Sequence, residues 1–187
     1  MKQFSKISFA FTFFAFLVSN VSLLSQFGGG DGTVIDPYQI STAAHLELIA
    51  DSVRNGNNWS NGKYFIVTND ITDSVRTMIG GNEWYYRSFQ GNFDGGGHTI
   101  TLAIDRTGIW SAGYSALFGS VFVTSSFKNI IVDGYVNGYV RASGIIVYIR
   151  KIYDSTTITI NNCINNAKIT ADEEWNSWRN CCGCMAI

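Results

Sequence analysis

Four aspartates, Asp70, Asp94, Asp105 and Asp133, are the side chains in this sequence best suited to acid–base chemistry. Cleavage of a glycosidic bond by a carboxylate pair requires two such groups about 5–10 Å apart on either side of the sugar. The sequence gives no spacing that pairs any two of them. Together with neighbouring asparagines they could instead form a calcium site, but no ligand set stands out. We therefore expect no catalytic residue, no metal site and no cofactor.

The segment Asp94-Gly-Gly-Gly-His98 offers two further kinds of chemistry. A glycine-rich turn can hold a phosphate when the N-terminus of a following helix faces the anion. Here the alternation of apolar and polar residues over 99–104 predicts a strand, which argues against a phosphate loop. The chain has 2 histidines, His45 and His98, and no second ligand at metal-binding spacing. We interpret the segment as a tight corner in which Asp94 accepts a hydrogen bond from its own turn.

Three consecutive aromatic residues, Trp84, Tyr85 and Tyr86, are the candidate binding residues. Their rings could stack on the faces of a sugar, or they could fix a loop onto the core. Paired carboxylates in a groove beside them would indicate a carbohydrate-active enzyme, a lyase or a glycosidase. Carboxylates scattered over separate corners would indicate a non-catalytic binding module, which is the function we expect.

The four cysteines, Cys163, Cys181, Cys182 and Cys184, are crowded toward the end of the chain. An even count in a secreted protein suggests disulfides. Zinc is poorly supported, because the closely spaced group lacks a matching second pair. A third explanation is a shifted reading frame or a truncated sequence after about residue 177, because a repeat described below predicts a Gly-Gly-Ile-Val-like stretch there.

Composition favours an extracellular all-β protein of one domain. The 187 residues include 14% charged and 14% aromatic residues, with 19 Gly and 1 Pro. The net charge of −1 becomes −3 if Lys2 and Lys6 are removed with a leader. This balance gives no electrostatic reason to expect nucleic acid or an anionic membrane as a partner.

Residues 1–25 have the pattern of a secretory signal peptide: lysines at the start, then an apolar run from Ile7 to Val18. The run is short for a membrane span, which needs about 20 apolar residues. We expect cleavage near Ser25, residues 28–32 as a flexible leader, and a secreted or surface-displayed bacterial protein in residues 26–187.

The remaining elements follow from periodicity. Apolar residues at helical spacing predict one amphipathic helix at about residues 42–54, with Ser41 or Thr42 as its N-cap and its apolar stripe over the open end of a sheet. Short strands are predicted at 63–68 and around 99–104.

The second half of the chain contains two repeated elements. Residues 127–136 align with residues 160–169 at an offset of 33, which places Asn129 on Asn162 and Ile131 on Ile164. Residues 116–119 align with residues 144–147. Short strands repeating at this period predict a solenoid, in which neighbouring turns bury one shared core. We expect the corner asparagines to form a hydrogen-bonded ladder: Asn129, Asn161, Asn162, Asn165 and Asn166.

These repeats, with the turn Phe89-Gln-Gly-Asn-Phe-Asp-Gly and the following Gly97-His-Thr-Ile100, resemble bacterial secreted proteins that carry the GLUG motif. Ala116-Leu-Phe-Gly119 resembles the motif itself, and Phe127-Lys-Asn-Ile130 the strand after it. The resemblance covers about residues 30–178. Ala116 replaces a glycine of the motif, and Val147 replaces its closing glycine in the second copy. The residues that carry the structural pattern are Gly91, Asp94, Gly95, Gly97, His98, Leu117, Gly119 and Gly144.

The resemblance implies a right-handed parallel β-helix with no catalytic residues. With the short helix at one end and no polar repeat closing the other, we expect the first segment of a longer surface protein. The function expected is adhesive or structural, with extracellular carbohydrate or a host protein as the partner and no membrane contact after signal cleavage.

Overall fold

The chain is described here by a computed structural model covering residues 26–81, 87–107, 114–122, 124–150 and 157–171. Within these residues the protein is all-β apart from one helix. The elements in chain order are β1 (Tyr38–Ile40), α2 (Ala43–Arg54), β2 (Tyr64–Val67), β3 (Ile71–Val75), β4 (Asn92–Asp94), β5 (Thr99–Asp105), β6 (Tyr114–Ser115), β7 (Phe118–Phe122), β8 (Ser125–Lys128), β9 (Ile131–Gly138), β10 (Arg141–Ala142), β11 (Ile146–Arg150), β12 (Ile158–Asn161), β13 (Ile164–Asn165) and β14 (Lys168–Ala171).

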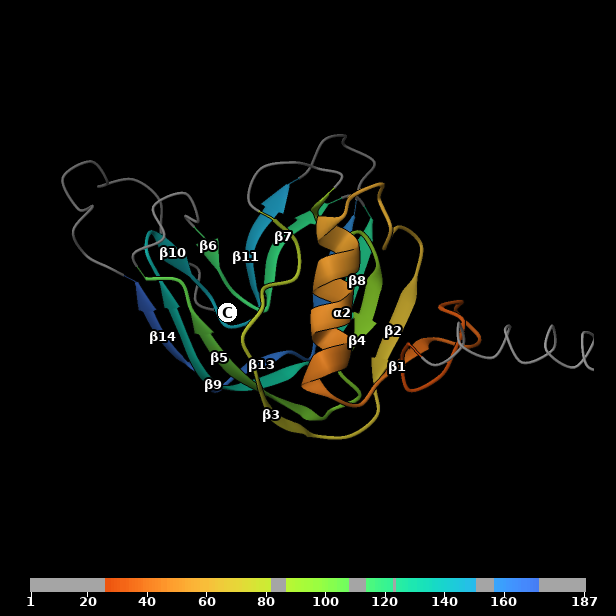
Figure 1. Cartoon of the computed structure of the whole chain (residues 1–187), viewed down its shortest axis with the longest axis horizontal. Coiled ribbons are helices and arrows are strands. Elements are labelled where there is room, and N and C mark those ends of the chain that lie inside the picture. Colours follow the sequence, from red (N-terminus) through yellow and green to blue (C-terminus); the bar gives the residue numbers. More distant parts are fainter. Residues whose placement is uncertain (1–25, 82–86, 108–113, 123, 151–156, 172–187) are drawn as a thin grey trace, which may run out of the picture.

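The strands form parallel sheets. One sheet has the order β1-β2-β4-β8-β12, and a second has the order β13-β9-β5-β3 with β14 also paired to β9. Two smaller sheets pair β10 with β6 and β11 with β7. Figure 1 shows these sheets arranged around a common interior, with α2 in front of them. All pairings between the described strands are parallel, which fits strands that recur at intervals of about one repeat.

The helix confirms the sequence prediction for residues 42–54. Thr42 is the N-cap, and its hydroxyl oxygen accepts the backbone N–H of His45 at 3.3 Å. The helix buries Leu46, Ile49 and Val53 almost completely. Each such side chain contributes on the order of 1.5–3 kcal/mol of hydrophobic stabilisation. The apolar stripe therefore packs on the sheets, and α2 covers the end of the molecule that faces the reader in Figure 1.

Strand register confirms both repeat alignments. Ile164 lies opposite Ile131 and Ile169 opposite Val136, an offset of 33 residues, while Ile146 lies opposite Phe118. The two aligned isoleucines do not form the interior, however. Ile131 is only half-buried and follows the fully buried Ile130, so Ile131 and Ile164 lie on the outer side of their sheet.

The interior consists of side chains from successive strands placed opposite one another. Phe65, Phe93 and Phe127 are in register across β2, β4 and β8, and each is at most 1% exposed. The ring of Phe118 lies 4.9 Å from that of Phe127, centroid to centroid. These contacts fix the strands that carry the polar corner described below.

The expectation of a flexible leader at residues 28–32 is wrong. Gly28 N–H donates to the carbonyl oxygen of Gln39 at 2.9 Å, and Gln39 N–H donates to that of Gly29 at 2.9 Å. The preceding Phe27 is 8% exposed and lies 4.7 Å from the ring of Tyr38. The segment is therefore fixed along β1 by backbone bonds and by its aromatic neighbour.

Several predictions concern residues outside the described ranges. These are the signal peptide at residues 1–25, the aromatic residues Trp84, Tyr85 and Tyr86, and the shifted frame after about residue 177 with Cys181, Cys182 and Cys184. The one helix of the described ranges, α2, lacks the length and apolar character that a bilayer span requires.

Candidate functional site

In the described part of the chain, three polar side chains form a row at one corner of the molecule: Asp94, Asn129 and Asn162, called here the corner row. Asp94 ends β4, Asn129 follows β8, and Asn162 follows β12. Asn162 Nδ2 donates to Asn129 Oδ1 at 2.8 Å, and Asn129 Nδ2 donates to Asp94 Oδ1 at 3.0 Å. The asparagine ladder expected from the repeats is therefore present for two of its five members.

The backbone at this corner explains why asparagine occupies it. Asn129 and Asn162 have φ values of 54° and 52°, in the left-handed region that asparagine tolerates better than most residues. This conformation turns the chain from one sheet into the next. Asn129 N–H donates to the carbonyl oxygen of Asn161 at 3.1 Å, which ties neighbouring corners together.

The carboxylate of Asp94 accepts hydrogen bonds from two residues and forms an ion pair with a third. Its Oδ1 accepts the backbone N–H of Gly96 at 2.9 Å, which confirms the predicted turn, and its Oδ2 lies 3.1 Å from Lys128 Nζ. Burial opposes ionisation, but the bonds from Gly96, Asn129 and Lys128, with the lysine charge, outweigh it and lower the pKa of Asp94. Asp94 is therefore a charged acceptor that organises the corner.

The glycines of the predicted motif make close approaches around this corner and elsewhere. A Cβ on Gly95 would meet the backbone of Asn129 and Ile130, and a Cβ on Gly91 would lie 2.9 Å from the carbonyl oxygen of Ser60. Gly97 instead has open space around it and a φ of +75°. Gly119 approaches Met78 and Gly80, Gly144 approaches the side chain of Asn165, and Leu117 is fully buried.

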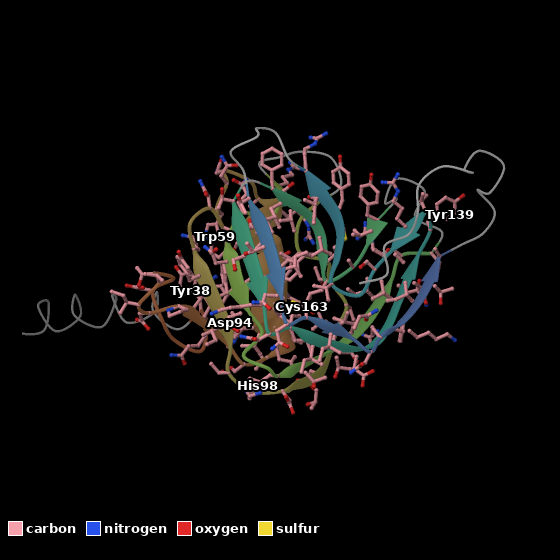
Figure 2. The ribbon with its side chains drawn as sticks, turned by 180° about the vertical axis from the view of Figure 1, so that it is seen from behind. Tyr38, Trp59, Asp94, His98, Tyr139 and Cys163 are labelled. Atoms are coloured by element: carbon pink, nitrogen blue, oxygen red, sulfur yellow. The ribbon has the colours of Figure 1, made fainter. Side chains whose placement is uncertain are left out.

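His98 belongs to the same corner. Its backbone N–H donates to Gly95 at 2.9 Å, and its Nδ1 lies 3.4 Å from Asp70 Oδ1. The same oxygen of Asp70 accepts the N–H of Thr99 at 2.9 Å. Figure 2 shows Asp94, His98 and Cys163 on the same side of the molecule. The described residues bring together no group of three or more His, Cys, Asp or Glu side chains that could hold a metal ion.

The remaining asparagines and aspartates bond locally. Asn165 Oδ1 accepts the N–H of Ala167 at 3.1 Å, so it serves its own turn and not the ladder. Asp133 accepts the N–H of Gly134 at 2.7 Å. Asp105 accepts the hydroxyl of Thr107 at 2.7 Å, and bonds from Thr107 and Asn137 lower the pKa of Asp105.

No two of the aspartates on paired strands face each other. Strand register places Asp94 opposite Lys128, Asp105 opposite Asn137, and Asp133 opposite Thr101. A carboxylate pair across a sugar needs two such groups at controlled separation. Among the described residues, the strand register gives no such pair, and each of the four carboxylates accepts hydrogen bonds from its own corner.

Sequence reasoning missed an aromatic group on β6 and β11. The rings of Tyr114 and Tyr148 are stacked, with centroids 5.4 Å apart and planes inclined by 9°. The guanidinium of Arg141 lies 5.3 Å from the centre of the Tyr114 ring, and both tyrosines are half-buried. Their strands are not bonded to each other, since β6 pairs with β10 and β11 with β7. No linear spacing could therefore have revealed the contact.

Cys163 is the single cysteine among the described residues. Its Sγ lies 3.4 Å from the carbonyl oxygen of Asn161, a contact within its own corner.

Comparison with known proteins gives one informative similarity. Over 116 residues the chain is 34% identical to a protein of Evansella cellulosilytica named "Putative Gly-rich membrane protein". The match covers 59% of this chain and 12% of that protein, so the chain spans a small part of its relative. No family model and no solved structure matches the chain.

Proposed function

We propose that this protein is a non-catalytic module of the bacterial cell surface, adhesive or structural, built as a right-handed parallel β-helix of the GLUG-motif type. The observation that carries the proposal is the corner row. Asp94, Asn129 and Asn162 come from three successive strands of one sheet, and their polar groups bond to each other and to the turn. Side chains used in this way hold a stack of strands together, and they are not free to act on a substrate.

The parallel register supports the β-helix. Offsets of 33 residues between β9 and β14, and of 28 residues between β7 and β11, repeat one unit of chain on top of another. Repeating units that bury a common interior are the mark of solenoids.

Two observations support a location at the cell surface: the N-terminal sequence and the name of a similar protein. Residues 1–25 have the composition of an export signal. The similar protein from Evansella cellulosilytica is named "Putative Gly-rich membrane protein", and this name is the second support for the proposal. We propose secretion followed by display outside the cell.

Carbohydrate is the ligand class that we propose for this surface. Tyr114 and Tyr148 offer stacked aromatic rings beside the cation of Arg141, and aromatic faces with a polar neighbour suit the C–H faces and hydroxyl groups of sugars. The aromatic residues Trp84, Tyr85 and Tyr86, predicted from the sequence, remain further candidates for the same role.

A glycan array probed with the purified chain tests this proposal. We expect binding to a subset of polysaccharides, lost in the double variant Tyr114→Ala, Tyr148→Ala and kept in Tyr135→Ala, an exposed tyrosine on β9. The same preparations are incubated with the bound polysaccharides, and reducing ends and unsaturated products are measured. Turnover that disappears in Asp94→Asn or Asp105→Asn would overturn the non-catalytic assignment and establish a carbohydrate-active enzyme. Binding to host protein with no glycan bound would overturn the ligand class alone.

A further inference from the structure

The two stacked tyrosines lie on the outward side of their strands. Ser115, which follows Tyr114, is fully buried, and successive side chains of a strand point to opposite faces, so Tyr114 points away from the interior. Tyr148 also points outward, because the next residue, Ile149, lies opposite the buried core residue Val121. Figure 1 shows β10, β6, β11 and β7 next to one another. The outward side of a sheet stays accessible even where another strand pairs with its edge, because strand pairing and side chains run in perpendicular directions.

The guanidinium of Arg141 lies on this same side and has no carboxylate partner. Arg141 is exposed and lies opposite Tyr114 in strand register. Its guanidinium lies 5.3 Å from the centre of the Tyr114 ring, and its Nη1 donates to the Tyr114 hydroxyl oxygen at 3.4 Å. Among the described residues, carboxylates lie within ion-pair distance of Arg54, His98 and Lys128, but not of Arg141. The tyrosine therefore holds the planar guanidinium in place while its other N–H donors remain available to a ligand.

The strands around this arrangement carry positive charge and lack strong acceptor side chains. β6, β7, β10 and β11 have the sequences YS, FGSVF, RA and IVYIR, so their charged residues are Arg141 and Arg150, and these four strands contain no Asp, Glu, Asn or Gln. Arg150 is exposed and follows Tyr148 by two positions, which places it on the same outward side. Charged donors without carboxylate or amide acceptors are best complemented by a ligand that supplies negatively charged acceptors.

Resting on the proposed carbohydrate ligand, we infer that this protein recognises acidic polysaccharides, and that Arg141 binds a carboxylate or sulfate group of the sugar. The anionic oxygens accept from the Arg141 guanidinium and from the Tyr114 hydroxyl, whose oxygen already accepts from Arg141. Such charge-assisted hydrogen bonds are roughly twice as strong as neutral ones. The apolar face of the sugar ring packs against the tyrosine pair, and Arg150 attracts further negative charge along the polysaccharide.

Isothermal titration calorimetry of the full-length chain with oligomers of glucuronic acid tests the inference. The matched ligand is the same oligomer with its carboxyl groups reduced to alcohols, which keeps the ring and the linkage and removes the charge. Sulfated dextran, compared with plain dextran, supplies sulfate in place of carboxylate. We expect the acidic oligomer to bind about tenfold or more tightly than the reduced one. Its affinity should fall as salt is added, because the charges are exposed.

Substitutions of Arg141 locate the anion. Arg141→Gln should lower the affinity for the acidic oligomer about tenfold, and Arg141→Lys should give an intermediate value, because lysine keeps the charge and loses the planar fork. Arg54→Gln is the matched control: it removes the same charge from α2, where Arg54 is paired with Asp51, and should leave the affinity unchanged. The comparison of acidic with reduced oligomers and the salt dependence use the unmodified protein, so they decide the question even if a variant fails to fold.

The outcomes separate this inference from the proposed function. Equal binding of acidic and reduced oligomers, lost in the double variant Tyr114→Ala, Tyr148→Ala, would overturn the acidic ligand and leave a carbohydrate ligand standing. Acidic binding that is unchanged in Arg141→Gln would overturn the assigned site. Binding of sulfated dextran without binding of glucuronic acid oligomers would support the inference and identify the anion as sulfate. A glycan array on which neither acidic nor neutral saccharides bind would overturn both proposals.

Discussion

Asn162 donates its side-chain amide to the side-chain oxygen of Asn129 at 2.8 Å, although 33 residues of chain separate them. Asn129 in turn donates to Asp94, 35 residues earlier. A bond of this kind can form only if each repeat returns the chain to the same corner. The corner row therefore reports the register of β4, β8 and β12 in their sheet, and it is the best place to test what holds these three strands together.

Two substitutions of Asn129 distinguish what its side-chain hydrogen bonds and its left-handed backbone conformation each contribute to the free energy of unfolding. Asn129→Ala should lower the free energy of unfolding by roughly 2 kcal/mol, because it removes two hydrogen bonds and forces alanine into the left-handed region. Asn129→Gly should cost about 1 kcal/mol less, because glycine accepts this backbone conformation. Urea unfolding measures both values.

Asn166→Ala is the control for the corner row, because Asn166 is exposed and bonds through its backbone N–H to Val132. It should change stability little. Equal losses for Asn129→Ala and Asn129→Gly would show that backbone strain contributes nothing. No loss in either variant would remove the stabilising role of the row.

Sequence periodicity was sufficient to predict the elements whose signal is local or repeated. The helix at residues 43–54 has an apolar stripe and a threonine cap, and both can be seen within one segment. The pairing of Asn129 with Asn162 follows from an offset that two copies of the repeat reveal. The corner aspartate also followed from local chemistry, because Asp94 accepts the N–H of Gly96 two residues later.

Features that depend on distant contacts could not be predicted in this way. The glycines at 28–32 suggested flexibility, but backbone bonds to Gln39 and the burial of Phe27 against Tyr38 fix them. The outward orientation of Ile131 could not be predicted from the alternation of apolar and polar residues either. The left-handed turn at Asn129 resets the alternation, so Ile130 points inward and Ile131 outward.

Gly95 should tolerate no side chain. A Cβ there would approach the backbone of Asn129 and lie 2.6 Å from Ile130 Cα, and backbone atoms cannot move aside as a flexible side chain can. We expect Gly95→Ala to lower the free energy of unfolding by about 1–3 kcal/mol. Thermal and urea unfolding measure the loss.

Gly97→Ala is the matched comparison, because Gly97 has nothing within 4 Å of an added Cβ but has a φ of +75°. Its cost should be about 1 kcal/mol, from backbone strain alone. A larger loss for Gly97 than for Gly95 would contradict the close approach of neighbouring corners.

Asp94 should stabilise the protein in a pH-dependent way. Its pKa in the folded state is lowered by the bonds that outweigh burial, so folding favours the ionised form. This stabilisation is complete above the ordinary value of 3.8 and is lost as pH falls through the lower folded value. Asp94→Ala should cost about 1 kcal/mol near neutrality, and the difference from the unmodified protein should shrink in acid.

The free energy of unfolding measured across the acid range checks this expectation. In an Asn129→Ala background the pH dependence due to Asp94 should be smaller, because one of the bonds to the carboxylate is gone. A difference between Asp94→Ala and the unmodified protein that stays constant down to the lowest pH would argue against a lowered pKa.

His45 should make the N-terminal end of the fold sensitive to mild acid. Burial lowers the pKa of His45 below 6.5, and its Nδ1 accepts the backbone N–H of Ser41 at 3.2 Å, which only an unprotonated nitrogen can do. The unfolded chain therefore takes up a proton at higher pH than the folded chain. Stability should be complete above about pH 6.5, should fall as pH drops below it, and should level off below the folded pKa.

The measurement is urea unfolding between about pH 7.5 and about pH 5, in a His98→Gln background that leaves His45 as the remaining histidine of the chain. His45→Asn is the test variant, because its side-chain oxygen is able to accept the Ser41 N–H without titrating in this range. The decrease in stability should be present with His45 and absent with asparagine. Identical pH profiles for the two proteins would show that the Nδ1 atom of His45 does not link the start of α2 to pH.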